Sequence, residues 1–362
     1  NASSIPSAGQ GFITYVYDDD DLDGTPDGFP KHLLTENTQR SGNVSPTLSF
    51  TDSGSAINDG WNLVGNPYGA TIDWDATSGL ASTNLDATFY VWSSSANSGS
   101  GAYLTWNGST GTLTDGKIAP WQGFWVKANA ADPTLSLTDE ARSSNGVFLK
   151  KKITPVLSFT LKGNELESLT IVSLQSDAST GKDKYDAYKL GSLNSIFLSL
   201  FTSLDNGDAL DINTLPNNLE ETLYIPLDMN GSNLDGAFEL NWDAKALPDT
   251  WLFTLVNNMT GEELNLLEES SFNFELDAPA KQASSQTIDT LTTPLHGVVQ
   301  PSILKAKVGT QSRFTLRIVP SGVSVSNEET KELPRVVELQ QNYPNPFNPS
   351  TSINFGVPTS GK

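Results

Sequence analysis

Residues 238–242 read Phe238-Glu239-Leu240-Asn241-Trp242, and residues 272–276 read Phe272-Asn273-Phe274-Glu275-Leu276. In both stretches an apolar side chain alternates with a polar one, which is the period of a β-strand that has one buried and one solvated face. This alternation is typical of antiparallel sheets that cover a core on one side. The two stretches therefore predict an antiparallel β-sandwich in this part of the chain.

Other short strands are predicted along the same region and along the region that precedes it. Between them lie clusters of turn-forming residues, and the whole chain has 29 glycines and 20 prolines. In the second region the predicted strands are Val156–Leu161, Ser168–Ser173, Tyr185–Leu190, Ser195–Phe201, Leu223–Leu227, Ala237–Trp242, Trp251–Val256, Ser271–Leu276 and Arg313–Val319. In the first region they are Thr47–Phe50, Trp61–Val64, Thr88–Trp92, Ala102–Trp106, Gly123–Ala128 and Thr134–Leu137.

The fold class that follows is all-β, with two tandem antiparallel β-sandwich-like domains and an extended C-terminal segment. We expect the first β-rich domain at residues 1–148 and the second at residues 149–320. A polar linker is expected at residues 321–338, before a final segment at residues 339–362.

Composition limits the classes of partner. The 362 residues include 42 acidic and 21 basic side chains, which give a net charge of −21 and disfavour nucleic acids and anionic membranes. There is no cysteine, so disulfides cannot contribute to stability. No run approaches the roughly 20 apolar residues that span a bilayer, and we expect no membrane insertion. Because the chain begins with Asn1, we expect a mature or proteolysed fragment.

An acidic loop is the clearest candidate metal site. Asp19, Asp21, Asp23 and Asp27 follow an Asp-x-Asp-x-Asp-Gly-x-x-Asp spacing, in which alternate carboxylates converge and the carbonyl of Thr25 adds a further oxygen. Hard oxygen ligands of this kind suit calcium. The loop resembles the calcium loops of thrombospondin type 3 repeats and dockerins, but proline stands where an EF-hand has its bidentate glutamate. We expect structural calcium, and a solvated acidic turn is the alternative.

Tryptophans are dense in the first domain, where they offer a candidate sugar-binding face. Most of them lie in alternating strands, where an indole usually belongs to the core. Trp106 and Trp121 are flanked by turn residues, so we expect these two to be exposed and to be the candidate ligand-binding residues.

Near the C-terminus, residues 339–349 read Leu-Gln-Gln-Asn-Tyr-Pro-Asn-Pro-Phe-Asn-Pro, and a short alternating strand with Pro358 at its end follows. The prolines remove backbone donors and require an extended course. The pattern resembles the opening of the type A C-terminal sorting domain of proteins exported by the bacterial type IX secretion system. The resemblance assigns sorting or docking to Leu339, Asn342, Tyr343, Pro344, Pro346, Phe347, Pro349, Ile353 and Phe355.

Three more stretches resemble β-rich modules that occur just upstream of type IX sorting domains. They are Gly60–Tyr68, which reads Gly-Trp-Asn-Leu-Val-Gly-Asn-Pro-Tyr, Lys117–Ala128, and Tyr185–Leu190, which reads Tyr-Asp-Ala-Tyr-Lys-Leu. This resemblance implies export through the periplasm to the outer cell surface or the medium, and the type IX machinery as a partner. It implies no particular activity.

Catalytic signatures find little support, and we expect no enzyme. His32 and His296 are far apart, and neither belongs to a metal-ligand spacing. We therefore predict a non-catalytic structural or adhesive module of an exported protein. Two alternatives stay open. The first is a subunit of an extracellular filament, in which neighbouring copies of the chain are held together by strand addition. The second is a carbohydrate-binding accessory to a missing upstream enzyme, with surface glycans as its partner.

Overall fold

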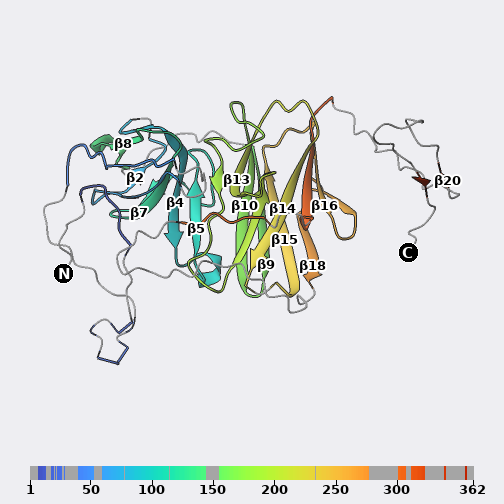
Figure 1. Ribbon diagram of the computed structural model, residues 1–362, viewed down its shortest axis with the longest axis horizontal. Coiled ribbons are helices and arrows are strands. Elements are labelled where there is room, and N and C mark those ends of the chain that lie inside the picture. The colour runs from blue at the N-terminus through green and yellow to red at the C-terminus, as the bar shows by residue number, and fades with distance from the viewer. Residues whose placement is uncertain are drawn as a thin grey trace, which may run out of the picture.

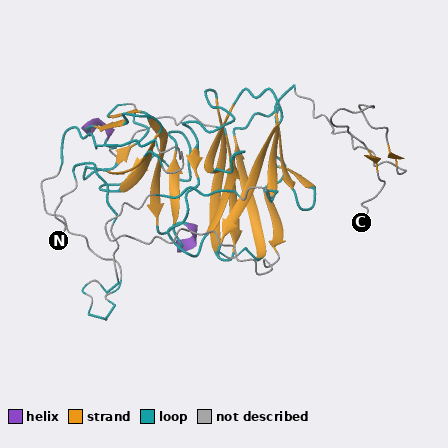
Figure 2. Ribbon diagram, viewed as in Figure 1, coloured by secondary structure: helices purple, strands orange, loops and turns teal. Residues whose placement is uncertain are grey.

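The structure is a computed structural model in which β-strands dominate, so the all-β class is confirmed (Figures 1 and 2). In the described part of the chain, no helix has the length and apolar character that crossing a membrane requires. The structure describes residues 7–13, 18–19, 21, 23–26, 28, 40–52, 59–76, 78–113, 115–143, 155–232, 234–276, 301–306 and 311–322, and the backbone of 338–339 and 355–356.

The first unit comprises eight strands and two short 3-10 helices. They are β1 (Trp61–Gly65), β2 (Ile72–Asp73), β3 (Leu80–Thr83), β4 (Leu85–Ser93), η1 (Asn97–Gly99), β5 (Ala102–Trp106), β6 (Lys117–Ile118), β7 (Gly123–Ala128), β8 (Thr134–Leu137) and η2 (Asp139–Ala141). The main antiparallel sheet has the order β1-β7-β4-β5, and β2 pairs with β6 and β3 with β8. Val64, Phe89, Phe124 and Val126 are fully buried in its core.

Gly60 lies directly before β1, at a position that requires glycine. Its φ is +81°, and its carbonyl accepts a 2.7 Å hydrogen bond from the amide of Ala128 on β7. A Cβ at this position would lie 2.1 Å from the carbonyl oxygen of Ala128. Only glycine allows both the positive φ and this close approach.

The second unit is one large sheet folded on itself. Its strands are β9 (Val156–Gly163), β10 (Leu166–Gln175), β11 (Ala187–Tyr188), β12 (Leu198–Ser203), β13 (Ala209–Pro216), β14 (Leu223–Gly231), β15 (Gly236–Lys245), β16 (Leu252–Asn257), β17 (Glu262–Asn265), β18 (Ser271–Leu276) and β19 (Phe314–Val319). Their order is β17-β16-β19-β14-β12-β13-β10-β9-β15-β18, and β11 pairs with β13. Phe274 of β18 packs edge-on against Phe314 of β19 with 5.2 Å between ring centroids, which joins distant parts of the sheet in one core.

The alternation of residues 238–242 is confirmed, because Phe238, Leu240 and Trp242 are buried and the residues between them are less so. Strands 102–106, 123–128, 134–137 and 271–276 match their predictions residue for residue. Two details differ. Thr47–Phe50 forms no strand, and β10 and β13 run parallel, whereas the other paired strands of the described chain are antiparallel.

Candidate functional site

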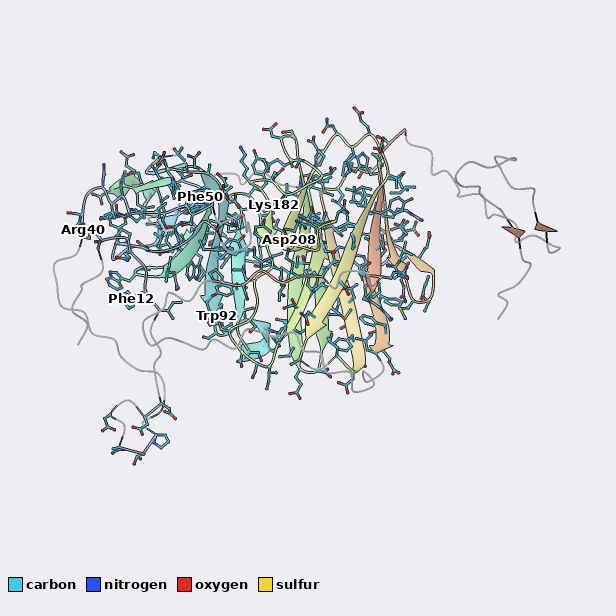
Figure 3. The ribbon with its side chains drawn as sticks, in the orientation of Figure 1. Phe12, Arg40, Phe50, Trp92, Lys182 and Asp208 are labelled. Atoms are coloured by element: carbon cyan, nitrogen blue, oxygen red, sulfur yellow. The ribbon has the colours of Figure 1, made fainter. Side chains whose placement is uncertain are left out.

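The two units meet along a seam that contains its own apolar core. Trp61, Tyr90 and Trp125 of the first unit and Tyr188 and Ile212 of the second belong to one buried cluster. Trp61 and Tyr90 meet in a T-shaped contact with 5.2 Å between ring centroids. Figure 3 shows the side chains here, with Lys182 and Asp208 labelled between the units. The two units therefore share a core in addition to their separate ones.

The stretch Tyr185–Leu190, together with the loop before it, makes several of the polar contacts across the seam. The backbone of this segment forms hydrogen bonds with β4 and with the turn after β5. Because hydrogen bonds are directional, they fix the orientation of the two units, which the apolar contact alone does not. The amide of Tyr188 donates to the hydroxyl of Tyr90 (3.0 Å), and the amide of Ala87 donates to the carbonyl of Lys184 (3.0 Å). The hydroxyl of Thr88 donates to the carbonyl of Asp186 (3.2 Å), and the side-chain amide of Asn107 donates to the carbonyl of Tyr185 (2.6 Å).

A buried ion pair lies at the centre of the seam. Lys189 Nζ is 2.6 Å from Asp211 Oδ1 and also donates to the carbonyl of Leu169 at 2.7 Å, and both charged residues are almost fully buried. The other carboxylate oxygen of Asp211 accepts hydrogen bonds from the first unit, from Thr105 Oγ1 at 2.5 Å and Thr112 Oγ1 at 3.3 Å. Burying charges is unfavourable unless they are paired and bonded, and here the first unit supplies part of that bonding.

A second lysine lies at the edge of this core. Lys127 Nζ is 5.4 Å from the ring centroid of Trp61 and 6.0 Å from that of Tyr188, and it donates to the carbonyl of Asp59 at 2.5 Å. Burial lowers the pKa of Lys127 and raises the pKa of Tyr188. The ammonium of Lys127 thus makes cation–π contacts with an aromatic ring of each unit.

Asp186 is a buried acid within the stretch Tyr185–Leu190. It is fully buried, its Oδ1 accepts from the amide of Thr214 at 2.7 Å, and its Oδ2 accepts from the amide of Asp183 at 2.7 Å. Burial raises its pKa to about 7, and the two amide hydrogen bonds oppose this rise. The carboxyl holds the stretch before β11 against β13, which is a structural role.

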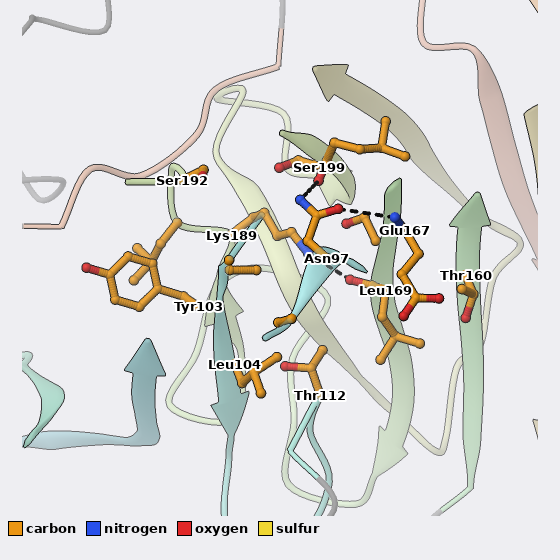
Figure 4. Close-up of a pocket in the computed structure, with 16 residues that line it drawn as sticks. Asn97, Tyr103, Leu104, Thr112, Thr160, Glu167, Leu169, Lys189, Ser192 and Ser199 are labelled. Atoms are coloured by element: carbon orange, nitrogen blue, oxygen red, sulfur yellow. Dashed lines mark hydrogen bonds between the residues drawn. The ribbon is translucent and has the colours of Figure 1, made fainter. Parts of the chain in front are cut away.

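A cavity of about 290 Å³ opens beside the seam, between η1 and the second unit (Figure 4). The amide of Asn97 spans it, because its Nδ2 donates to the carbonyl of Leu198 at 3.4 Å and its Oδ1 accepts from the amide of Glu167 at 3.1 Å. Lys189, which also lines it, is occupied by Asp211 and Leu169. The polar groups of this cavity thus connect the two units.

The structure brings the predicted aspartates of the acidic loop together. One carboxylate oxygen from each of Asp19, Asp21 and Asp23 lies within 4.8 Å of the others. Asp19 accepts from the amides of Asp23 at 3.1 Å and Gly24 at 2.8 Å, and Asp23 accepts from the amide of Thr25 at 2.7 Å. Three hard oxygen donors at one point are the ligand type that calcium prefers. Asp27 lies outside the described residues.

The two predicted ligand-binding tryptophans differ. Trp106 is 2% exposed, and its indole N–H donates to Asp75 Oδ1 at 2.7 Å, so the expectation that it is exposed is wrong. β5 ends at Trp106, and its last side chain turns into the core of the first unit. Trp121 is 66% exposed, as expected.

Of the predicted sorting residues, only Leu339 and Phe355 fall on described backbone. Leu339 belongs to β20 (Glu338–Leu339), Phe355 belongs to β21 (Phe355–Gly356), and the two residues are partners in an antiparallel pair. The remaining ones lie outside the described residues, and they are Asn342, Tyr343, Pro344, Pro346, Phe347, Pro349 and Ile353.

Sequence reasoning found the stretch Tyr185–Leu190 but not its partners. The available signal was the polar content of Ala209–Pro216, where Asp211, Asn213 and Thr214 lie in a strand that is buried almost throughout.

No protein-family model, no curated protein and no solved structure matches this chain.

Proposed function

We propose that this chain is a non-catalytic structural module of an exported cell-surface or secreted protein, in which the two β-rich units act as one stiff spacer or adhesive body. The observation that supports this most is the seam. Thr105 and Thr112 of the first unit donate to Asp211 of the second, and separating the units would break these bonds and expose the shared apolar cluster to water.

Export by the type IX route is the second part of the proposal. It is supported by the run from Leu339 to Pro349 and by the stretches Gly60–Tyr68 and Tyr185–Leu190. The machinery of that route is the expected partner, and the outer surface or the medium is the expected location. The test is to replace Tyr343 and Phe347 by alanine in the natural gene product and to follow it in a bacterium that has this secretion system. Retention in the periplasm is expected, and unchanged export would contradict the proposal.

Structural calcium in the acidic loop is the third part. The convergence of Asp19, Asp21 and Asp23 supports it, because three carboxylates this close repel one another unless a cation or solvent screens them. Bound calcium would fix the course of the loop, and these carboxylates with the Thr25 carbonyl would hold the ion. The expected role is stability and protection from proteolysis.

Calorimetry of the full chain tests the spacer role. If the units act as one body, unfolding is a single transition in which the calorimetric and van't Hoff enthalpies agree. Two resolved transitions would show that the units unfold independently, and the proposal of a stiff body would be wrong.

A further inference from the structure

Trp121 occupies a backbone position that tryptophan rarely takes. The amide of Gln122 donates to the carbonyl of Ala119 at 3.1 Å, which closes a β-turn with Pro120 and Trp121 at its two central positions. The φ of Trp121 is +58°. A proline followed by a positive φ is the pattern of a type II turn, whose third residue is usually glycine or asparagine. A bulky side chain is strained there.

The indole does not compensate this strain by packing. Trp121 is 66% exposed, whereas the other seven tryptophans of the chain are buried or half-buried. A residue that is strained and also exposed contributes little to the fold. Such strain is concentrated at sites where a side chain must be presented in a fixed direction.

Asn66 holds the turn rigidly in place. It is 2% exposed, and its Nδ2 donates to the carbonyls of Ile118 at 3.2 Å and Ala119 at 2.9 Å, on the entry side of the turn. Its own backbone amide donates to the carbonyl of Gln122 at 3.0 Å, on the exit side. Asn66 belongs to the stretch Gly60–Tyr68, so two of the stretches that stand out in the sequence meet at this turn. A fixed aromatic side chain loses little conformational freedom when it binds.

From this geometry we propose that Trp121 is a contact platform for a neutral polysaccharide. A sugar ring offers an apolar C–H face to an indole and hydroxyls to the polar groups beside it. The net charge of −21 disfavours anionic polysaccharides and nucleic acids. Among the described residues of the first unit, the other large exposed apolar side chains are Phe12 and Ile13. These two residues follow Gln10, which pairs with β1 on the side of that strand opposite to β7. Within the part of the first unit that the structure describes, Trp121 therefore has no apolar surround of the kind that a protein interface requires.

Affinity electrophoresis of the full chain tests this inference, with hydroxyethyl cellulose, xyloglucan, galactomannan and amylopectin cast separately into native gels. We expect at least one polymer to retard the wild-type chain, and Trp121→Gly and Trp121→Asn to abolish the retardation. Tyr224→Ala is the matched control, because Tyr224 is an aromatic residue of β14 that is 63% exposed and has no positive φ. It should migrate like the wild type.

The thermal stability of the same variants separates binding from a structural role. Because glycine and asparagine suit a positive φ, both Trp121 variants should melt at the wild-type temperature or above it. A lower melting temperature for both variants would make Trp121 a structural residue and overturn the inference, as would the absence of retardation by all four polymers. Neither result would affect the proposed spacer role, which depends on the seam.

Discussion

Thr105 of the first unit donates a 2.5 Å hydrogen bond to the carboxylate of Asp211, which is 99% buried in the second unit. The opposite oxygen of that carboxylate binds Lys189. One aspartate thus receives bonds from both units, and neither unit alone satisfies it. We take this relationship as the basis for treating the two units as one body.

Removal of the Thr105 hydroxyl should weaken the whole chain. Thr105→Val keeps the side-chain shape but takes away one donor to a buried carboxylate, and we expect a loss of about 1–3 kcal/mol in the free energy of unfolding. Urea denaturation measures the change. Thr83→Val, on the exposed strand β3, is the control and should stay within about 0.5 kcal/mol of the wild type. Equal stabilities for the two variants would contradict the role of the Thr105 hydroxyl.

The stability of the chain should fall as pH rises towards neutrality, because of Asp186. Burial raises its pKa from 3.8 to about 7, so between these values the folded state keeps a proton that the unfolded state has released. The contribution of Asp186 to the free energy of unfolding is therefore largest below pH 4, and this contribution, on the order of 4 kcal/mol, is lost as pH rises through 7.

The variant Asp186→Asn tests this origin. It cannot titrate, so the decrease in unfolding free energy between pH 4 and pH 7 should be smaller than in the wild type. It should also be less stable at low pH, since its amide group would oppose one of the two backbone N–H donors. Asp177→Asn, an exposed change on the same loop, should keep the wild-type slope. If Asp186→Asn also keeps that slope, the pH dependence has another source.

Calcium should bind to the acidic loop, with a loss of affinity when one carboxylate is removed. Titration calorimetry of the full chain should give about one site, and Asp21→Asn should lower the affinity by about tenfold or more, because charge count sets the strength of such sites. Asp249→Asn, an exposed aspartate of the second unit, should bind like the wild type. If the wild type releases no heat and limited proteolysis is the same with calcium and with chelator, the loop is only a turn.

Gly60→Ala should destabilise the first unit. The new Cβ would approach the carbonyl oxygen of Ala128 to 2.1 Å, and the φ of +81° would be strained, so we expect a loss of about 2 kcal/mol or more. Gly108→Ala isolates the strain, because its φ is +90° and no described atom lies within 4 Å of its Cβ. It should cost about 1 kcal/mol. Equal losses would show that the contact with Ala128 is unimportant.

Much of the fold could be predicted from alternation alone, as the match of residues 238–242 and 271–276 shows. The strand β13 could not be predicted in this way. Its sequence, Ala-Leu-Asp-Ile-Asn-Thr-Leu-Pro, places Asp211 and Asn213 where a half-buried strand would expose them. Both are buried instead, and Asp211 is bonded by Thr105 and Thr112 of the first unit, whereas Asn213 donates to Thr202. Polar residues that a distant segment satisfies leave no local pattern.

In the candidate site, too, the features that depend on nearby residues could be predicted and those that depend on distant residues could not. The acidic loop is local, so spacing alone predicted that Asp19, Asp21 and Asp23 would converge. Trp106 was predicted to be exposed because turn residues flank it, but its indole N–H finds Asp75, 31 residues earlier in the sequence. The strain at Trp121 is also a property of the folded backbone, since the sequence Ala-Pro-Trp-Gln shows a turn but not the sign of φ.

If the seam holds the two units as one body, the distance between a site in each unit is fixed. Because the chain has no cysteine, Ser82→Cys in the first unit and Asn273→Cys in the second can carry a pair of spin labels without further changes. The reference pair, Asp177→Cys with Asn273→Cys, lies entirely in the second unit. Pulsed electron paramagnetic resonance should give a single distance distribution between Ser82 and Asn273 that is as narrow as that of the reference pair. A broad or divided distribution for the pair that crosses the seam, with a narrow one for the reference pair, would show that the two units move independently.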